Sequence, residues 1–154
     1  MIVLRDTVEI KASPEEIFEF FVHFKENFYA WHPDHVECRY LRGSSILEKD
    51  AILYVEEYLH GDLHRLKLRA TKVIPDSRVE YTAGFGIGGA FEVQPREDSV
   101  LFIAEITIGL GVPGLGSLLD RTMERVLASR IEAMEQHMAE EGENLKQWLE
   151  QRPS

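Results

Sequence analysis

Hydrophobic and polar residues alternate along most of the first two thirds of the chain. The first such stretch, residues 2–10, is rich in β-branched side chains and predicts a strand. The same pattern predicts six further strands near residues 36–42, 51–60, 63–74, 78–84, 89–95 and 99–109. Short links rich in Gly, Pro, Asp and Ser separate these six. Consecutive strands joined by such short links indicate an antiparallel meander.

Helical patterns occupy the two ends of this strand series. After the first strand, Ser13-Pro14-Glu15-Glu16 combines a capping box with proline at the first helical position, so a helix should begin there. A second short helix is expected over residues 26–31, ending before Pro33. Residues 117–151 contain no proline, and only Gly142 weakens what is otherwise one long helix.

Two glycine-rich stretches are predicted to be mobile loops near a cavity mouth. Residues 84–89 satisfy the G-x-G-x-x-G pattern, but they lie between two predicted strands and open no helix. They therefore cannot present a helix N-terminus to a pyrophosphate, and no nucleotide cofactor is expected. Residues 109–116 hold four glycines and a proline, which is typical of a loop.

Three features resemble the START/Bet v 1-like (SRPBCC) helix-grip superfamily, including its polyketide cyclase/dehydrase-like branch. They are the strand–Ser–Pro–helix opening over residues 8–18, the segment Trp31-His32-Pro33-Asp34, and the long amphipathic final helix. The resemblance covers nearly the whole chain. It implies an α+β helix-grip fold over residues 1–152, a single domain in which a curved antiparallel sheet of about seven strands wraps the last helix around an internal cavity. Members range from passive lipid carriers to enzymes, so the fold alone does not give the function.

The amino-acid composition excludes some classes of binding partner. The 154 residues carry a net charge of −10, and an acidic surface repels phosphate backbones, so neither nucleic acid nor anionic membranes are expected partners. Cys38 is the one cysteine, which excludes an internal disulfide. No apolar run is long enough to span a membrane and no secretion signal is evident, so a cytoplasmic protein is expected. The oligomeric state is open, a homodimer being one option.

The final helix contains polar residues on its apolar stripe. At about 100° per residue, Glu141 falls in the middle of the stripe near Met134, with His137 one turn away and Arg130 also facing inward. A carboxylate buried there is costly unless it is paired or binds a metal. His and Glu at i and i+4 share a face and can hold one ligand. Alternatively, Gly142 frays the helix and Glu141 reaches water.

A second inward carboxylate is predicted on the hairpin at Gly61-Asp62. A two-residue turn would pair Leu59 with His64 and Glu57 with Leu66. The resulting inner face carries Val55, Glu57, Leu59, His64, Leu66 and Leu68. A slip of one residue would bring Glu56 inward instead. The alternative is a partly solvated cavity mouth that tolerates a carboxylate.

The segment around Trp31 supplies the remaining candidates. Tyr29 and Trp31 are predicted to form the lip of a site for an aromatic ligand, and His32 or His35 either points inward or stays exposed in a loop. His32 or His35, together with Glu57, His137 and Glu141, would give two imidazoles and two carboxylates, a set that suits a divalent metal, zinc being the first choice.

This set is similar to the metal site of the phloretin hydrolase and diacetylphloroglucinol hydrolase family, which cleaves carbon–carbon bonds of acylated phenols. The resemblance implies His32, Glu57, His137 and Glu141 as metal ligands, the last three being catalytic. Trp31, Tyr29, Arg130, His64 and Met134 would then contact the ligand. The sequence thus leads to two hypotheses: a metal-dependent hydrolase or cyclase of phenolic or polyketide-like compounds, or a non-enzymatic carrier of a lipid or aromatic metabolite.

Overall fold

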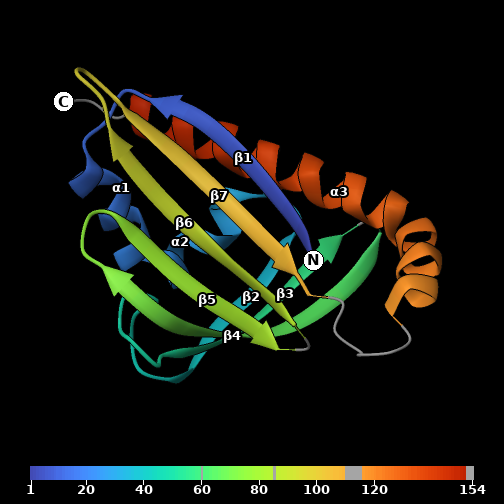
Figure 1. Cartoon of the computed structure of the whole chain (residues 1–154). Coiled ribbons are helices and arrows are strands. Elements are labelled where there is room, and N and C mark those ends of the chain that lie inside the picture. Colours follow the sequence, from blue (N-terminus) through green and yellow to red (C-terminus); the bar gives the residue numbers. More distant parts are fainter. Residues whose placement is uncertain (60, 85, 110–115, 152–154) are drawn as a thin grey trace.

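The fold is one seven-stranded antiparallel sheet curved around a long helix (Figure 1). The structure, a computed structural model, describes residues 1–59, 61–84, 86–109 and 116–151, with the side chains of 116–127 left aside. The strands lie in the order β1-β7-β6-β5-β4-β3-β2. In chain order the elements are β1 (Ile2–Ile10), α1 (Pro14–Val22), α2 (Phe24–Trp31), β2 (His35–Arg42), β3 (Ile52–Leu59), β4 (Asp62–Ile74), β5 (Arg78–Gly84), β6 (Ile87–Pro95), β7 (Val100–Ile108) and α3 (Gly116–Glu150). The predicted element order and fold class are confirmed.

The start of α1 is the predicted capping box. The Ser13 hydroxyl accepts a hydrogen bond from the Glu16 backbone N–H at 3.2 Å, and the Glu16 carboxylate accepts one from the Ser13 backbone N–H at 3.2 Å. These contacts satisfy amide groups that the first helical turn leaves unpaired. The second helix begins at Phe24, two residues before the predicted start.

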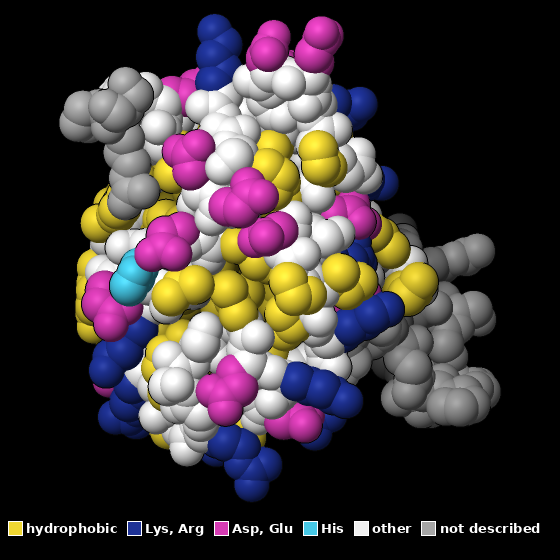
Figure 2. Space-filling model, turned by 90° about the vertical axis from the view of Figure 1, so that its left-hand side faces the viewer, with side chains coloured by type: hydrophobic (Ala, Val, Ile, Leu, Met, Phe, Trp, Pro, Cys, Tyr) yellow, Lys and Arg dark blue, Asp and Glu magenta, His cyan; other side chains and the backbone are white. Residues whose placement is uncertain are grey.

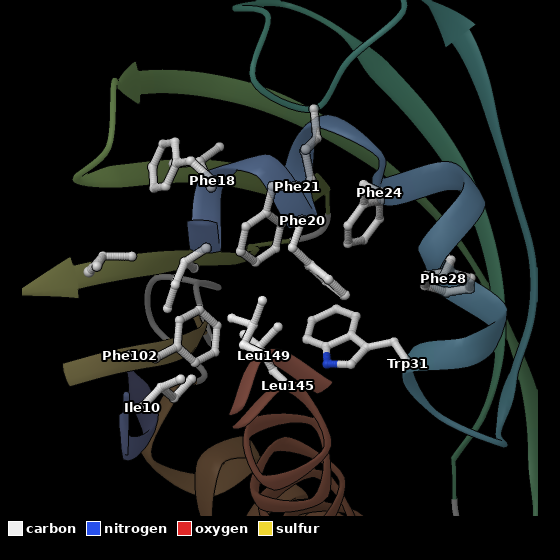
Figure 3. Packing of buried hydrophobic residues seen from close by; sticks show 14 of the residues in the cluster. Ile10, Phe18, Phe20, Phe21, Phe24, Phe28, Trp31, Phe102, Leu145 and Leu149 are labelled. Carbon is white, nitrogen blue, oxygen red and sulfur yellow. The ribbon is translucent and has the colours of Figure 1, made fainter. Parts of the chain in front are cut away.

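Aromatic side chains fill one end of the space between helices and sheet (Figure 3). Phe21 is completely buried, and its ring lies 5.0–6.4 Å, centroid to centroid, from rings on α1, α2, β6 and β7. The last turns of α3 add Leu145 and Leu149, at 0% and 4% exposure. All three helices thus contribute buried side chains to this aromatic core.

The long helix packs chiefly along β1 and does not break at its glycine. An ideal Cβ at position 142 would lie 3.1 Å from Asp6 Oδ2 and 3.2 Å from Val8 Cγ1. The missing side chain thus lets α3 approach β1 closely beside Glu141. The expectation that Gly142 frays the helix is wrong, because α3 continues to Glu150.

The β3–β4 hairpin has the predicted faces but not the predicted register. Leu59 pairs with Asp62 and Glu57 with His64, two residues away from the expected partners. Because side chains alternate with period two, a shift of two residues leaves every side chain on its predicted face. Glu57 accordingly points inward, whereas Glu56 lies on the outer face near Arg65 and Tyr54.

The predicted glycine loops are only partly described. Strand β6 begins at Ile87 instead of residue 89, and its first residues border the cavity. Residues 60, 85 and 110–115 lie outside the described residues, so the mobility expected of the two loops stays a prediction.

On the face turned toward the viewer in Figure 2, acidic and basic side chains are interspersed among hydrophobic ones. Among the described residues, no helix combines the length and apolar character that a membrane crossing requires.

Candidate metal centre

A cavity of about 360 Å³ lies between α3, α2 and the inner face of the sheet. That volume falls within the range of small-molecule sites. Its walls are largely apolar, with aromatic rings from α2 and β6 and aliphatic side chains from β3, β4, β6 and β7. Six polar side chains interrupt this lining: Glu57, His64, Tyr81, Arg130, His137 and Glu141.

His35, the first residue of β2, is held in one orientation by α2. Its Nδ1 lies 2.7 Å from the carbonyl oxygen of Phe28, and its ring stacks on the Phe28 ring at 4.0 Å with a 7° interplanar angle. A carbonyl can only accept a hydrogen bond, so Nδ1 carries the proton. In the neutral ring, Nε2 therefore has a free lone pair directed into the protein.

Three side chains, two from α3 and one from β3, converge on the Nε2 of His35. This atom lies 3.2 Å from His137 Nε2, 3.2 Å from Glu141 Oε2 and 3.5 Å from Glu57 Oε2. His137 Nε2 is in turn 3.5 Å from Glu57 Oε2 and 3.5 Å from Glu141 Oε1. Neighbouring ligand atoms of a tetrahedral zinc, each about 2.0–2.1 Å from the ion, are separated by roughly 3.2–3.5 Å. One ligand atom each of His35, Glu57 and His137 thus lies within 4.8 Å of the other two, as three ligands of one divalent cation would, while Glu141 approaches the two imidazoles with different oxygens.

The contacts around His35 also require positive charge. In the neutral ring the Nε2 lone pair faces oxygens of two carboxylates, and lone pairs at 3.2–3.5 Å repel each other unless a proton or a cation lies between them. Burial alone would disfavour the charged His137 ring, yet its hydrogen bond to Glu57 and the charges of Glu141, Glu57 and Asp34 raise its pKa to about 9. Burial likewise opposes ionisation of Glu57, but the His137 hydrogen bond and the nearby imidazoles hold its pKa below its usual range. Both shifts mean that the charges of the cluster favour a proton on His137 and an ionised Glu57.

Two hydrogen bonds join Trp31, at the C-terminal end of α2, to α3, the helix that carries His137 and Glu141. The indole N–H of Trp31 donates to the backbone carbonyl of Glu141 at 2.9 Å, and the Asn144 amide donates to the carbonyl of Trp31 at 2.9 Å. Trp31 is 1% exposed and packs in the aromatic core. The end of α2 is thereby anchored to α3 beside Glu141.

His32, which the resemblance implied as a metal ligand, falls in a second group of possible ligand atoms, with Asp34 and His137, rather than in the group of His35, Glu57 and His137. Its Nδ1 accepts the backbone N–H of Asp34 at 3.0 Å, so its Nε2–H donates to Glu140 Oε2 at 3.1 Å. Both ring nitrogens are thus engaged, and the ring packs against His137 at 4.1 Å. His35, the alternative left open by the sequence, takes the position instead, as the strand partner of Glu57.

The predicted ligand contacts divide in the same way. Trp31, His64, Arg130 and Met134 line the cavity. Arg130 is half exposed, with its guanidinium 4.0 Å from Asp62 Oδ2 on the hairpin. Tyr29 is 53% exposed and does not line the cavity, so its assignment as a ligand contact is wrong. Sequence reasoning missed Tyr81, although its alternation with buried Val79 places it on the inner face of β5.

The sequence matches a known family over most of its length. Residues 1–143 match the family described as polyketide cyclase / dehydrase and lipid transport, and the chain belongs to this family. No curated protein is a significant match.

Solved structures confirm the START/Bet v 1-like fold at low identity. The protein TTHA0849 from Thermus thermophilus superimposes with a TM-score of 0.70 at 14% identity, covering 99% of this chain and 100% of that one. A START superfamily protein from Mycobacterium smegmatis gives a TM-score of 0.59 at 19% identity, with 88% and 95% coverage. The di-domain ARO/CYC protein BexL of the BE-7585A biosynthetic pathway gives 0.67 at 16% identity, where 99% of this chain matches 51% of BexL.

Proposed function

We propose that the protein is a divalent-metal-dependent enzyme that hydrolyses or cyclises phenolic or polyketide-like compounds. The observation that supports this most is the convergence of buried His35 with three residues that line an apolar cavity, Glu57, His137 and Glu141. The family description includes both cyclases and lipid transport, so the family leaves the choice between enzyme and carrier to the site itself.

The donor set fits a divalent ion in both charge and type. Two carboxylates balance a 2+ charge, while two neutral imidazoles add donor atoms without adding charge. The Phe28 carbonyl fixes the His35 tautomer that leaves Nε2 free, which is the outer contact commonly found on metal-bound histidine. Imidazole and carboxylate donors suit zinc, with iron and nickel as alternatives.

Each group at the site has a simple role in such a reaction. A bound divalent cation would polarise a ligand carbonyl and lower the pKa of a coordinated water. The aromatic walls would orient a planar ring and exclude bulk water, and Arg130 at the cavity edge would attract an enolate or carboxylate group. In hydrolysis of an acylated phenol, water would add its hydroxyl to the acyl carbon and a proton to the ring carbon that is released.

A carrier is the second candidate, and the apolar lining of the cavity favours it. A carrier of a lipid or aromatic metabolite needs shape and hydrophobic surface, but it does not need two imidazoles and two carboxylates at one point. The two hypotheses therefore separate on the metal and on whether the bound compound is changed.

Metal analysis of protein purified without chelator tests the site. Mass spectrometry should find close to one zinc, iron or nickel per chain in the wild type, and His35→Ala and His137→Ala should lose it while circular dichroism shows a folded protein. His32→Ala and His64→Ala are the matched controls and should keep the metal. A wild type that stays metal-free after zinc addition contradicts the proposal, as does loss of metal from His32→Ala but not from His35→Ala.

Product analysis then separates enzyme from carrier. Zinc-loaded protein incubated with acylated phenols should release the free phenol and acid, detected by liquid chromatography and mass spectrometry, and His137→Ala should not. Recovery of intact ligands that co-purify with zinc-loaded protein would favour the carrier.

A further inference from the structure

Tyr81 is a polar side chain of the cavity with no role in the cluster described above. It lies on the inner face of β5, and its ring packs against Phe91 at 5.7 Å. Its hydroxyl makes no hydrogen bond with any side chain or backbone group among the described residues. Every fully buried polar side-chain atom of these residues has a hydrogen-bond partner, so the Tyr81 hydroxyl oxygen is not fully buried. The hydroxyl therefore opens onto the cavity, where a ligand or water is its available partner.

The neighbouring strand is adapted to this position of the phenol. Gly89 on β6 is the direct cross-strand partner of Tyr81. An ideal Cβ at position 89 would overlap the Tyr81 hydroxyl oxygen and the ring carbon that bears it. The Tyr81 phenol thus lies directly over Gly89. Any larger residue at position 89 would displace the phenol and its hydroxyl from this part of the cavity wall.

The surroundings keep this hydroxyl a donor. Burial, together with the negative charges of Glu141 and Glu57, raises the pKa of Tyr81 well above its usual range. A protonated phenol beside two carboxylates has a hydrogen to give and is not a base. It therefore suits a ligand atom that only accepts, such as a ketone, enolate or phenolate oxygen.

We propose that Tyr81 is a ligand-binding residue whose hydroxyl donates a hydrogen bond to an oxygen of the bound compound. The cavity would then prefer aromatic ketones and phenols over hydrocarbons or alkyl chains of similar size. The aromatic rings of Phe24, Phe28, Trp31 and Phe91 in the lining favour a planar ligand in the same way. The proposal deepens the proposed function by naming the ligand class, but it needs no metal to hold.

Calorimetric titration with two probes tests the assignment. The probes are ortho-hydroxyacetophenone, which offers two oxygens, and ethylbenzene, which is similar in size and offers none. Tyr81→Phe should weaken binding of the ketone about tenfold, the loss of one well-formed hydrogen bond, and leave ethylbenzene binding unchanged. Tyr58→Phe removes a hydroxyl from strand β3 at a residue that is 44% exposed and outside the cavity lining, and should change neither.

The outcomes distinguish this proposal from the metal site. Equal weakening of both probes would mean that Tyr81 shapes the cavity without recognising oxygen, and unchanged ketone binding, or none to the wild type at millimolar concentration, also overturns the proposal. Metal content measured on the same samples should be equal in wild type and Tyr81→Phe. If the wild type binds no metal but the tenfold effect appears, the metal proposal fails and the Tyr81 proposal stands.

Discussion

The two ends of one stripe on α3 differ in their side chains and in what these side chains contact. His137, Glu141, Leu145 and Leu149 follow one another at intervals of four residues, so they share a face of the helix. The first two contribute polar atoms to the cavity, whereas the last two are buried in the aromatic core. Trp31 belongs to both ends, since it packs in the core and donates to the Glu141 carbonyl. The polar and the apolar parts of this helix face are thus separated, with Trp31 at the border.

The largest expected effect comes from opening a hole in the aromatic core. Phe21→Ala removes a completely buried ring that packs against several other aromatic rings. The free energy of unfolding should fall by about 3–5 kcal/mol in urea titrations, because transfer and cavity terms add. Metal bound per folded chain, measured below the unfolding transition, should stay the same. Loss of metal from the folded variant would show that the two ends are not separate.

At the polar end, the expected effect depends on pH. In chelator-treated protein, the pKa of His137 is raised from 6.5 to about 9, so its stabilising contribution is complete below pH 6.5 and disappears as pH rises through 9. The lowered pKa of Glu57 contributes stability above pH 4.5 that is lost on acidification. Unfolding free energy should therefore decrease by on the order of 2 kcal/mol from pH 6 to pH 10.

A bound metal should remove this decline in stability with rising pH. Ligation needs neutral imidazole, so metal affinity grows as protons leave. The thermal unfolding temperature of zinc-loaded protein should not fall between pH 6 and pH 9. Metal-free His137→Gln should lose most of the pH dependence of stability that the metal-free wild type shows. An equal slope in metal-free wild type and His137→Gln would assign the pH dependence to other groups.

Residues on regular secondary structure could be predicted from the sequence, whereas residues placed by tertiary contacts could not. Regular elements follow from period-two alternation, the capping box at Ser13 and the proline-free final helix, and most of their boundaries fell within two residues. Glu57, His137 and Glu141 lie on repeating structure, so their faces were predictable, and Glu57 kept its face even though its register was wrong by two residues.

The remaining site residues depend on tertiary contacts. His32 and His35 flank Pro33-Asp34, between a helix and a strand, where no periodicity tells one from the other. The choice is made by the Phe28 carbonyl, which binds His35 Nδ1, and by Glu140, which engages His32. Tyr29 likewise looked like part of an aromatic lip, but its place on α2 turns it to solvent.

A smaller effect is expected at the border residue. Trp31→Phe keeps an aromatic ring in the core but removes the hydrogen bond to the Glu141 carbonyl. Stability should fall by about 1 kcal/mol for the lost bond, plus a packing cost for the smaller ring. Zinc affinity, from competition with a chromophoric chelator, should weaken about tenfold because Glu141 is less firmly placed. Asn144→Ala, which removes the donor to the Trp31 carbonyl, should act in the same direction; unchanged affinity in both variants would remove Trp31 from the support of the site.

The smallest net change in stability is expected for Gly142→Ala. This variant tests whether a small shift of α3 affects the neighbouring cluster. Replacing a helical glycine by alanine favours the helix by about 1 kcal/mol. The new methyl would lie 3.1 Å from Asp6 Oδ2 and 3.2 Å from Val8 Cγ1, so α3 or these side chains must shift by a few tenths of an ångström. The two effects should nearly cancel in the free energy of unfolding, leaving a change within about 0.5 kcal/mol.

Metal affinity offers no such compensation, because a shift of α3 moves the adjacent Glu141 relative to His35 and Glu57. Zinc binding to Gly142→Ala should therefore weaken several-fold while stability barely changes. The double variant Gly142→Ala with Val8→Ala removes the Cγ1 contact and should recover much of the affinity, and Val8→Ala alone supplies the baseline for the double-mutant cycle. If Gly142→Ala binds zinc as tightly as the wild type, the close approach of α3 to β1 is a packing feature with no bearing on the cluster.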